Sequence, residues 1–415
     1  MDKLLFLTPE LPFPPQSGGK VKSLKLINAL AERYEVTLAC PLKNEDASHL
    51  EAFHRVSPCV NHLHAPIDVP RSARSLLTSY SNRWPLNVQR TFHPMLAAQI
   101  RSIADRFDVV MMDHYEVYSY VPRTFEGLKV YHAHNAYYQI WSRYASLPGN
   151  PAMRAAAWAE SLRVRRCESR VAKNADLVFA APNDASELAA SGVDKTTIRD
   201  TYHLGDDSQL DLPELRFSDT RKKLMYVGFL GWEPNAQGLL WFIESVWPLL
   251  VSRQPDLVFD IVGKGADERL RAAVARHPGI RLRGFVEDLQ TVYRESRVSV
   301  APLLFGSGMK VKVLDSMARG MPTVTTPVGA EGIAAESGRH LLIAEDAEAM
   351  ADQVLAALSF PELWRRLRTE SRALVRERYT WSQLFDNMHR DLRLALDRHQ
   401  GAADAEITAS AQHAA

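Results

Sequence analysis

Cysteine is scarce in this chain of 415 residues, and the three that it has, Cys40, Cys59 and Cys167, form no CxxC pair. An odd and widely spaced set argues against a disulfide framework or a zinc site, and it fits a reducing compartment. A surplus of charge is also missing, because the formal net charge is only +1. No global field therefore favours nucleic acid as a partner, and any recognition of phosphate must be local.

A long apolar run is missing from the start of the chain as well. The first apolar residues, Leu4 to Leu7, are followed by Thr8 and Pro9. This is too short for a signal peptide or a membrane span. We therefore expect a first β-strand here and a cytoplasmic protein.

The length of the chain predicts two domains. A single hydrophobic core rarely supports 415 residues, so domains of about 200 residues each are expected. The content of 46% apolar and 24% charged residues is ordinary for a folded protein. Residues 401–415 are the exception, and we expect them to form a disordered tail.

Short apolar runs alternate with segments of helical length, which is typical of parallel sheets flanked by helices. The strands expected in the first half are KLLFLTP, VTLAC, DVVMMDH, KVYHAHN and ADLVFAA. Those expected in the second half are KLMYVGFL, LVFDIVG, IRLRGF, VSVAPLL, PTVTT and HLLIA. An acidic, proline-bearing segment predicts a linker at 203–221 between domains at 1–202 and 222–380. Residues 381–400 are expected to form a helix that packs back towards the first domain.

A glycine- and lysine-rich stretch, LLFGSGMKVKVLDSMARGMP, follows the apolar run VSVAP in the second half. The pattern predicts a helix that begins near Met309 or Lys310, with a loop at Phe305 to Gly308 before it. Glycines let backbone N–H groups approach an anion, and the start of a helix carries partial positive charge. Lys310 and Lys312 add full charges.

Asp315 lies five residues beyond Lys310, which is about 7 to 8 Å along a helix axis. This spacing suits a nucleoside diphosphate whose ribose hydroxyls are bound by the carboxylate. For any one of these residues taken singly, an ordinary solvated surface charge is the alternative.

At this point the sequence resembles a known family. FGSGMKVKVLDSMARGMPTVTTPVGAEGI is similar to the donor-binding segment of the GT-B-fold, retaining nucleotide-sugar glycosyltransferases of family 4, especially bacterial members that build exopolysaccharides. The resemblance continues in LMYVGFLGWEPNAQGLLWF, DIVGKG, RGFVEDLQTVYRESRVSVAP, PFPPQSGGK, HAHN and ADLVFAAPNDASEL. It implies two Rossmann-like, doubly wound parallel-sheet domains that face a central cleft, with the acceptor on the side of the first and the donor nucleotide in the second.

The resemblance implies the residues of the site. Catalytic roles fall on Lys310, His134 and Asp315. Gly18 and Gly19 would face the donor diphosphate, although a plain turn is the alternative, and Phe285 and Val286 would pack the nucleobase. The whole set expected to bind the donor is Gly18, Gly19, Gly228, Phe285, Val286, Gly306, Ser307, Gly308, Met309, Lys312 and Leu314.

Two departures from the family pattern concern this site. Members commonly carry two glutamates eight positions apart, where this chain has Ser307 and Asp315. Ser307 cannot act as the first carboxylate, so backbone amides would have to hold the sugar. Many members also place an arginine and a lysine after the first strand of the second domain, and GFLGWEPNAQG has neither. Lys310 and the start of the helix therefore have to neutralise a larger part of the negative charge of the diphosphate.

Two histidines, His132 and His134, lie on the same face of the expected strand KVYHAHN. A metal site is disfavoured because no third ligand stands at a recognisable spacing. A purely structural role is the alternative for either histidine. The resemblance implies that His134 contacts the donor sugar or phosphate. Asp113 and His114 end a neighbouring strand and are candidates for contact with the acceptor.

Two basic segments remain. Residues 71–104 contain five arginines among apolar anchors and no acidic residue, which suits either an anionic membrane face or a solvated surface. Arg163, Arg165, Arg166 and Arg170 share an expected helix with Glu160 and Glu168, which predicts charge pairing along the helix surface.

Taken together, the sequence predicts sugar transfer from a UDP- or GDP-sugar to a saccharide or lipid-linked acceptor, in polysaccharide or glycolipid biosynthesis. No cofactor, metal or nucleic acid is expected. Peripheral contact of residues 71–104 with the inner membrane face is the alternative to a solvated surface. The alternatives are a GT-B sugar-nucleotide epimerase and a non-catalytic protein that binds nucleotide sugars. A Rossmann oxidoreductase is disfavoured because no G-x-G-x-x-G follows a first strand.

Overall fold

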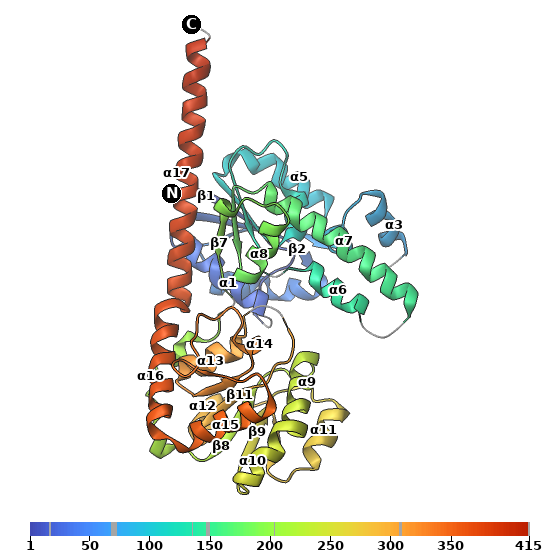
Figure 1. Cartoon of the computed structure of the whole chain (residues 1–415). Coiled ribbons are helices and arrows are strands. Elements are labelled where there is room, and N and C mark those ends of the chain that lie inside the picture. The colour runs from blue at the N-terminus through green and yellow to red at the C-terminus, as the bar shows by residue number, and fades with distance from the viewer. Residues whose placement is uncertain are drawn as a thin grey trace. The chain divides into compact units, whose positions relative to one another are not determined.

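The computed structural model describes residues 1–15, 18–67, 73–134, 136–146, 150–202, 204–306 and 309–413. The chain forms two compact units, one of Met1–Thr201 with Phe385–Ala415 and one of Tyr202–Leu384. Each unit is a parallel sheet flanked by helices, as Figure 1 shows. The predicted α/β fold class is confirmed.

The first unit contains a seven-stranded sheet in the order β3-β2-β1-β4-β5-β6-β7. Its strands are β1 Lys3–Leu7, β2 Glu35–Lys43, β3 Asn61–Ile67, β4 Val109–Asp113, β5 Leu128–His132, β6 Leu177–Ala180 and β7 Ile198–Asp200. Its helices are α1 Gly18–Ala31, α2 Leu50–Val56, α3 Ala73–Ser81, α4 Leu86–Thr91, α5 Pro94–Ile103, α6 Tyr138–Ser146, α7 Pro151–Lys173 and α8 Pro182–Ala190. The strand order reverses between β1 and β4, and ligands of such sheets bind at that point.

The second unit contains a six-stranded sheet in the order β10-β9-β8-β11-β12-β13. Its strands are β8 Lys223–Val227, β9 Val258–Val262, β10 Ile280–Gly284, β11 Val298–Ala301, β12 Thr323–Thr325 and β13 Leu342–Ile343. Its helices are α9 Glu233–Trp241, α10 Trp247–Arg253, α11 Glu268–Ala275, α12 Leu289–Glu295, α13 Val311–Arg319, α14 Pro327–Ala330, α15 Ala347–Ser359 and α16 Pro361–Arg378. All six predicted strands are present, and most residues of β8, β9, β11 and β12 are buried.

Two strands of the first sheet escaped the sequence analysis. β3 at one edge reads NHLHAPI and is partly exposed, while β7 at the other edge has three residues. Edge strands of this kind have no continuous apolar run, so their pattern does not stand out.

The helix predicted at 381–400 is present, and it is longer than the sequence predicted. Helix α17 spans Trp381–His413 and so continues through most of the expected tail at 401–415, whose many alanines are strong helix formers. From Phe385 onwards it belongs to the first unit, where the Tyr34 hydroxyl lies 3.0 Å from His389 Nδ1. The expected linker at 203–221 lies within the second unit, where Arg372 donates to the Leu210 carbonyl at 2.6 Å.

Candidate functional site

The loop after β11 leads into α13 at the point where the second sheet reverses its strand order. Helix α13 begins at Val311 with Lys310 as its N-cap residue, which confirms the predicted start. It ends at Gly320, whose left-handed φ of 74° makes it the expected stop. The exposed N–H groups of its first turn therefore follow directly on the glycine loop.

Lys310 is buried at the start of this helix, with 4% of its side chain exposed. Its Nζ lies 3.6 Å from Glu331 Oε2. Gly306 has φ +144°, and a Cβ there would lie 3.6 Å from Lys310 Cε and 3.7 Å from the Trp232 ring. The backbone conformation favours glycine at 306, while both contacts are at ordinary van der Waals distance. The neighbouring predicted residues Ser307 and Gly308 lie outside the described residues.

Lys312 points into the second unit. Its Nζ donates to the Tyr226 hydroxyl at 2.8 Å and to Asn235 Oδ1. Burial, with a smaller contribution from Lys310, lowers the pKa of Lys312 to about 7. Gly228 packs against this group, since a Cβ there would lie 3.2 Å from Lys312 Nζ. Lys312 thus points inward to Tyr226 and Asn235, whereas Lys310 lies at the start of the helix with Glu331 as its ion-pair partner.

Asn235 does not cap α9, although it lies in the first turn of this helix. The N-cap residue of α9 is Trp232, whose side chain makes no cap hydrogen bond. The Asn235 amide instead donates to the Phe229 carbonyl at 2.7 Å, while its oxygen accepts from Lys312. Asn235 therefore links the loop after β8 to the first turn of α13.

Asp315 faces residues 205 and 206 of the same unit. Its Oδ1 accepts the Asp206 N–H at 2.7 Å. Burial raises the pKa of Asp315 to about 6. A Cβ added at Gly205 would lie 1.8 Å from Asp315 Oδ1, so a glycine is needed for this approach. Its contact with a ribose stays a prediction.

The predicted nucleobase position lies after β10. Gly284 adopts φ +67°, and Phe285 follows with 65% of its surface exposed and the Lys264 ammonium 4.2 Å from its ring centroid. Val286 packs against the core cluster that contains Met225 and Val262. An exposed ring at the carboxyl end of a parallel strand can stack on a base.

Two further predicted donor contacts, Met309 and Leu314, differ in exposure. Met309 is half-buried and lies beside Gly332, whose added Cβ would be 3.8 Å from Met309 Cβ. Leu314 is 2% exposed and belongs to the inner stripe of α13, so its side chain packs in the core. Sequence reasoning did not select the exposed aromatics Phe229 and Trp232, although rings in the segment directly after a strand, GFLGW, were a usable signal.

In the first unit, Gly18 and Gly19 open α1 after the loop that follows β1. A Cβ at Gly19 would lie 3.7 Å from His134 Nδ1. Gly19 and His134 line a cavity of about 250 Å³. The other residues that line it are Thr8, Pro9, Glu10, Pro12, Lys20, Ser23, His114 and Tyr137. The structure therefore brings Gly19 and His134 together, as predicted residues of one site.

Asp113 organises the polar side chains beneath this cavity. Its Oδ1 accepts from His132 Nδ1 and His134 Nε2, each at 2.6 Å, and its Oδ2 accepts from the Ser23 hydroxyl at 2.5 Å. Burial alone would raise the pKa of Asp113, but the two imidazoles hold it well below its usual range. Burial lowers the pKa of each histidine to about 4, so both rings are neutral N–H donors at pH 7.

Asp113, His132 and His134 could hold a metal ion, since their ligand atoms lie within 4.8 Å of one another. Asp113 is the third ligand that the spacing of the sequence did not reveal. Lys22 is buried in the same network, where burial lowers its pKa to about 7 in spite of Asp113. A neighbouring amine and the hydrogen bonds already made to Asp113 favour a structural and orienting network over a metal site.

Comparisons with known proteins show which families and relatives have a similar sequence. Residues 221–359 match the family described as Glycosyl transferases group 1. An uncharacterized 44.6 kDa protein in the cps region of Klebsiella pneumoniae is 22% identical over 405 residues, which are 94% of this chain and 100% of that protein. Phosphatidyl-myo-inositol mannosyltransferase of Mycolicibacterium smegmatis is 31% identical over 161 residues, which are 37% of this chain and 41% of the relative.

Solved structures share the fold at low sequence identity. Anabaena HepE in complex with UDP and glucose superposes with a TM-score of 0.63 at 14% identity, over 95% of this chain and 100% of that one. Sucrose-phosphate synthase from Thermosynechococcus elongatus gives a TM-score of 0.64 at 16% identity, over 96% and 100%. Within the described part of the chain, no helix has both the length and the apolar character that crossing a membrane requires. The chain thus has the GT-B fold, and residues 221–359 in its second unit match the model of the glycosyl transferases group 1 family.

Proposed function

We propose that the protein transfers a sugar from a nucleoside-diphosphate sugar to an acceptor hydroxyl with retention of configuration, in the assembly of a polysaccharide or glycolipid. The observation that carries the proposal is the placement of Lys310. It is buried at the N-cap of α13, after the strand β11 at which the sheet order reverses, within the group 1 domain. The relatives named for mannosyl transfer and the solved complexes with UDP-glucose and UDP support the reaction class.

The chemistry proposed for this site is stabilisation of the leaving diphosphate. The bond between the sugar C1 and the diphosphate oxygen breaks, and a bond from C1 to the acceptor oxygen forms. Negative charge then grows on the diphosphate, where the Lys310 ammonium and the N–H groups of α13 can stabilise it. The acceptor proton passes to a phosphate oxygen of the leaving group, so no protein carboxylate is needed as general base.

Other residues are proposed to orient the donor. Asp315 would accept hydrogen bonds from the ribose, and Phe285 would stack on a uracil or guanine base. His134, Gly18 and Gly19 stay the predicted contacts to the sugar and the diphosphate. Positive charge from Lys310 would serve in place of a divalent metal, and the segment after each apolar strand shows no Asp-x-Asp motif to bind one.

A panel of UDP-, GDP- and ADP-sugars, scored by thermal unfolding, tests the donor. A ligand present at 100 times its Kd adds about 2.7 kcal/mol to the free energy of unfolding. We expect stabilisation by one nucleotide class, and a smaller effect in the Lys310→Gln variant. If no nucleotide sugar stabilises the protein, the proposal fails.

The second experiment tests transfer. With the donor so identified, release of free nucleoside diphosphate is followed in the presence of alkyl glycoside and polyprenyl diphosphate acceptors, and the anomeric configuration of the product is read by NMR. Inversion would refute retention. Binding without release would favour the non-catalytic alternative, which the serine at 307 in place of a carboxylate motivates.

A further inference from the structure

A basic groove runs along the C-terminal half of α7 in the first unit. Its cations, all exposed, are Arg165, Arg166, Arg170 and Lys173. Ser169, Asn174 and Ser191 complete the lining of a hollow of about 610 Å³. Among the described residues, the lining contains no aspartate or glutamate.

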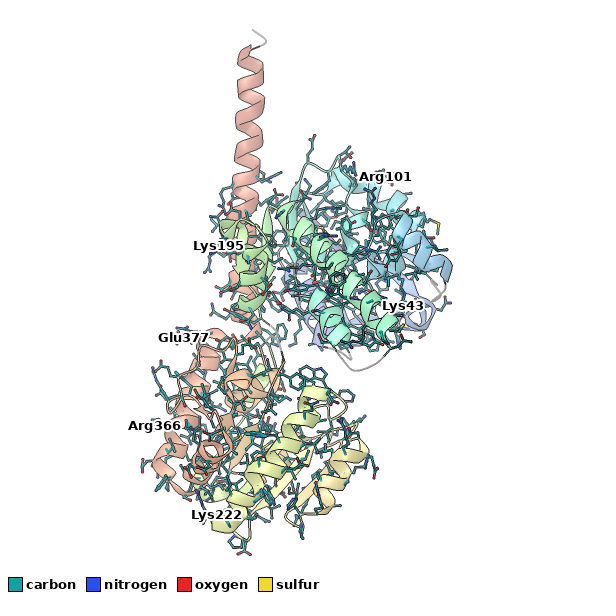
Figure 2. All side chains as sticks on the ribbon, turned by 45° about the vertical axis from the view of Figure 1, so that its right-hand side comes forward. Lys43, Arg101, Lys195, Lys222, Arg366 and Glu377 are labelled. Atoms are coloured by element: carbon teal, nitrogen blue, oxygen red, sulfur yellow. The ribbon has the colours of Figure 1, made fainter. Side chains whose placement is uncertain are left out.

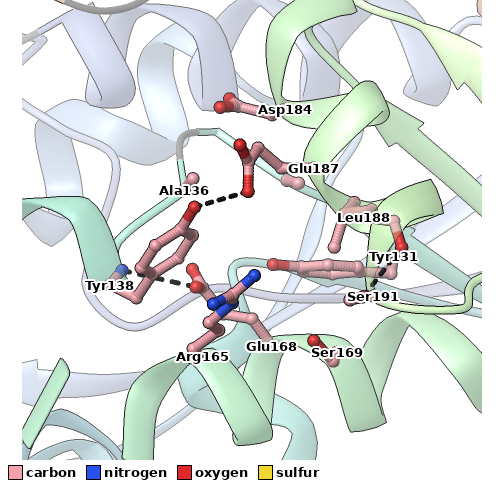
Figure 3. Close-up of a pocket in the computed structure, with 11 residues that line it drawn as sticks. Tyr131, Ala136, Tyr138, Arg165, Glu168, Ser169, Asp184, Glu187, Leu188 and Ser191 are labelled. Atoms are coloured by element: carbon pink, nitrogen blue, oxygen red, sulfur yellow. Dashed lines mark hydrogen bonds between the residues drawn. The ribbon is translucent and has the colours of Figure 1, made fainter. Parts of the chain in front are cut away.

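The charge pairing that the sequence predicted along this helix is wrong for these cations. Glu160 pairs with Arg163 at 2.6 Å and accepts the Leu86 N–H. Glu168 is buried and accepts the N–H groups of Tyr137 at 2.8 Å and Tyr138 at 3.3 Å. It lines an adjoining hollow that shares Arg165, Ser169 and Ser191 with the groove, and Figure 3 shows Arg165 and Glu168 side by side there. In the described ranges, none of the four groove cations has an ion pair with a carboxylate.

The C-terminal ends of two helices offset a part of this positive charge. Arg170 and Lys173 lie in the last turn of α7, and Ser191 follows the end of α8. Each helix C-terminus corresponds to about half a negative charge, so the two together offset about one of the four positive charges. Arg166 and Arg170, four residues apart, also repel each other. The exposed Glu187 carboxylate lines the adjoining hollow with Arg165 and offsets about one more charge. A net positive charge of about two is left in the groove.

We propose that this groove, which we call the α7 groove, binds a phosphate group. Two N–H groups of one arginine guanidinium can bind two oxygens of a phosphate, and the Ser169 hydroxyl and the Asn174 amide are suitable further donors. The ligand can be a soluble phosphate or the phosphate of a lipid headgroup. The groove belongs to the first unit, and none of the residues that line it is assigned to the proposed sugar-transfer site.

Trp158 makes the lipid source the one to test first. Its side chain is 59% exposed on the same helix. It precedes Arg165 by seven residues, which is about 10 Å along the axis and nearly two full turns, so both lie on one face. An exposed tryptophan beside cations suits the interface of an anionic membrane.

The experiment compares the full-length wild type with an Arg166→Gln/Arg170→Gln variant. The matched control is Arg366→Gln/Arg376→Gln, which removes the same charge from exposed positions of α16 in the second unit; Figure 2 shows Arg366 on the outside of that unit. One arm measures cosedimentation with vesicles of phosphatidylglycerol and phosphatidylcholine, against phosphatidylcholine alone. The other arm measures binding of sodium pyrophosphate by calorimetry. Thermal unfolding of each variant shows that it is folded.

We expect salt-sensitive binding in at least one arm, weakened about 25-fold by the groove variant, since each cation near an anionic surface contributes about fivefold. The control should stay within twofold of the wild type. Trp158→Ala should weaken vesicle binding and leave pyrophosphate binding unchanged if the source is a lipid. The inference is overturned if neither arm shows binding, if groove and control variants weaken it equally, or if Lys310→Gln abolishes a pyrophosphate signal that the groove variant keeps.

Discussion

Replacing Lys310 by glutamine tests the proposed phosphate site most directly. Glutamine keeps a similar length and removes the positive charge. In the folded protein, Lys310 Nζ lies 3.6 Å from Glu331, whose side chain is 39% exposed. Water can therefore solvate Glu331 after the change, and no buried charge is left without compensation. We expect a loss of about 1 kcal/mol or less in the free energy of unfolding.

Turnover should respond far more strongly than stability. Removal of one preorganised donor to a developing negative charge typically costs about 2.7 to 4 kcal/mol, or a factor of 10² to 10³ in kcat. The effect on kcat should exceed the effect on KM, because the negative charge of the diphosphate grows as the sugar leaves.

The assay is the initial rate of nucleoside diphosphate release at saturating donor and acceptor, with urea unfolding measured on the same preparations. Lys222→Gln is the matched control, since Lys222 is exposed in the same unit (Figure 2). The control should keep wild-type turnover. A kcat within threefold of the wild type for Lys310→Gln would refute the phosphate site, and a loss of more than about 3 kcal/mol in stability would make Lys310 a structural residue.

Three further predictions follow from buried groups. Gly205→Ala should lower the affinity for UDP about tenfold, as measured by calorimetry, because the new Cβ would displace the Asp315 carboxylate. The loss corresponds to roughly one charged hydrogen bond to the ribose. An affinity equal to that of the wild type would show that Asp315 does not bind the ribose. Asp113→Ala should lower the free energy of urea unfolding by about 3 kcal/mol, because it leaves two buried imidazole N–H groups without their acceptor, and a change below 1 kcal/mol would contradict the network. Burial raises the pKa of Glu168 to about 8 from its ordinary value of 4.5, so its contribution to stability is complete below pH 4.5 and is lost as the pH rises to 8. Glu168→Gln should therefore lose less stability than the wild type between pH 5 and pH 8, and parallel pH profiles would show that Glu168 titrates normally.

Much of the second unit was readable in the sequence. Strands β8, β9 and β11 are buried along most of their length, so each appears as an apolar run, and the helix start at Lys310 and its stop at Gly320 depend on local backbone preferences. The same local signals did not reveal β3 and β7, since edge strands are short or partly polar.

The partners of the polar groups were decided by the tertiary structure. Asp113 meets His132 and His134 because β4 and β5 are neighbours in the sheet, and Lys312 meets Tyr226 because β8 lies beside β11. Glu168 turns towards the backbone of Tyr137, which leaves the α7 cations without the pairs that their spacing predicted. Local sequence determines where a strand or helix begins and ends, whereas the direction of a polar side chain depends on which groups distant in sequence pack against it.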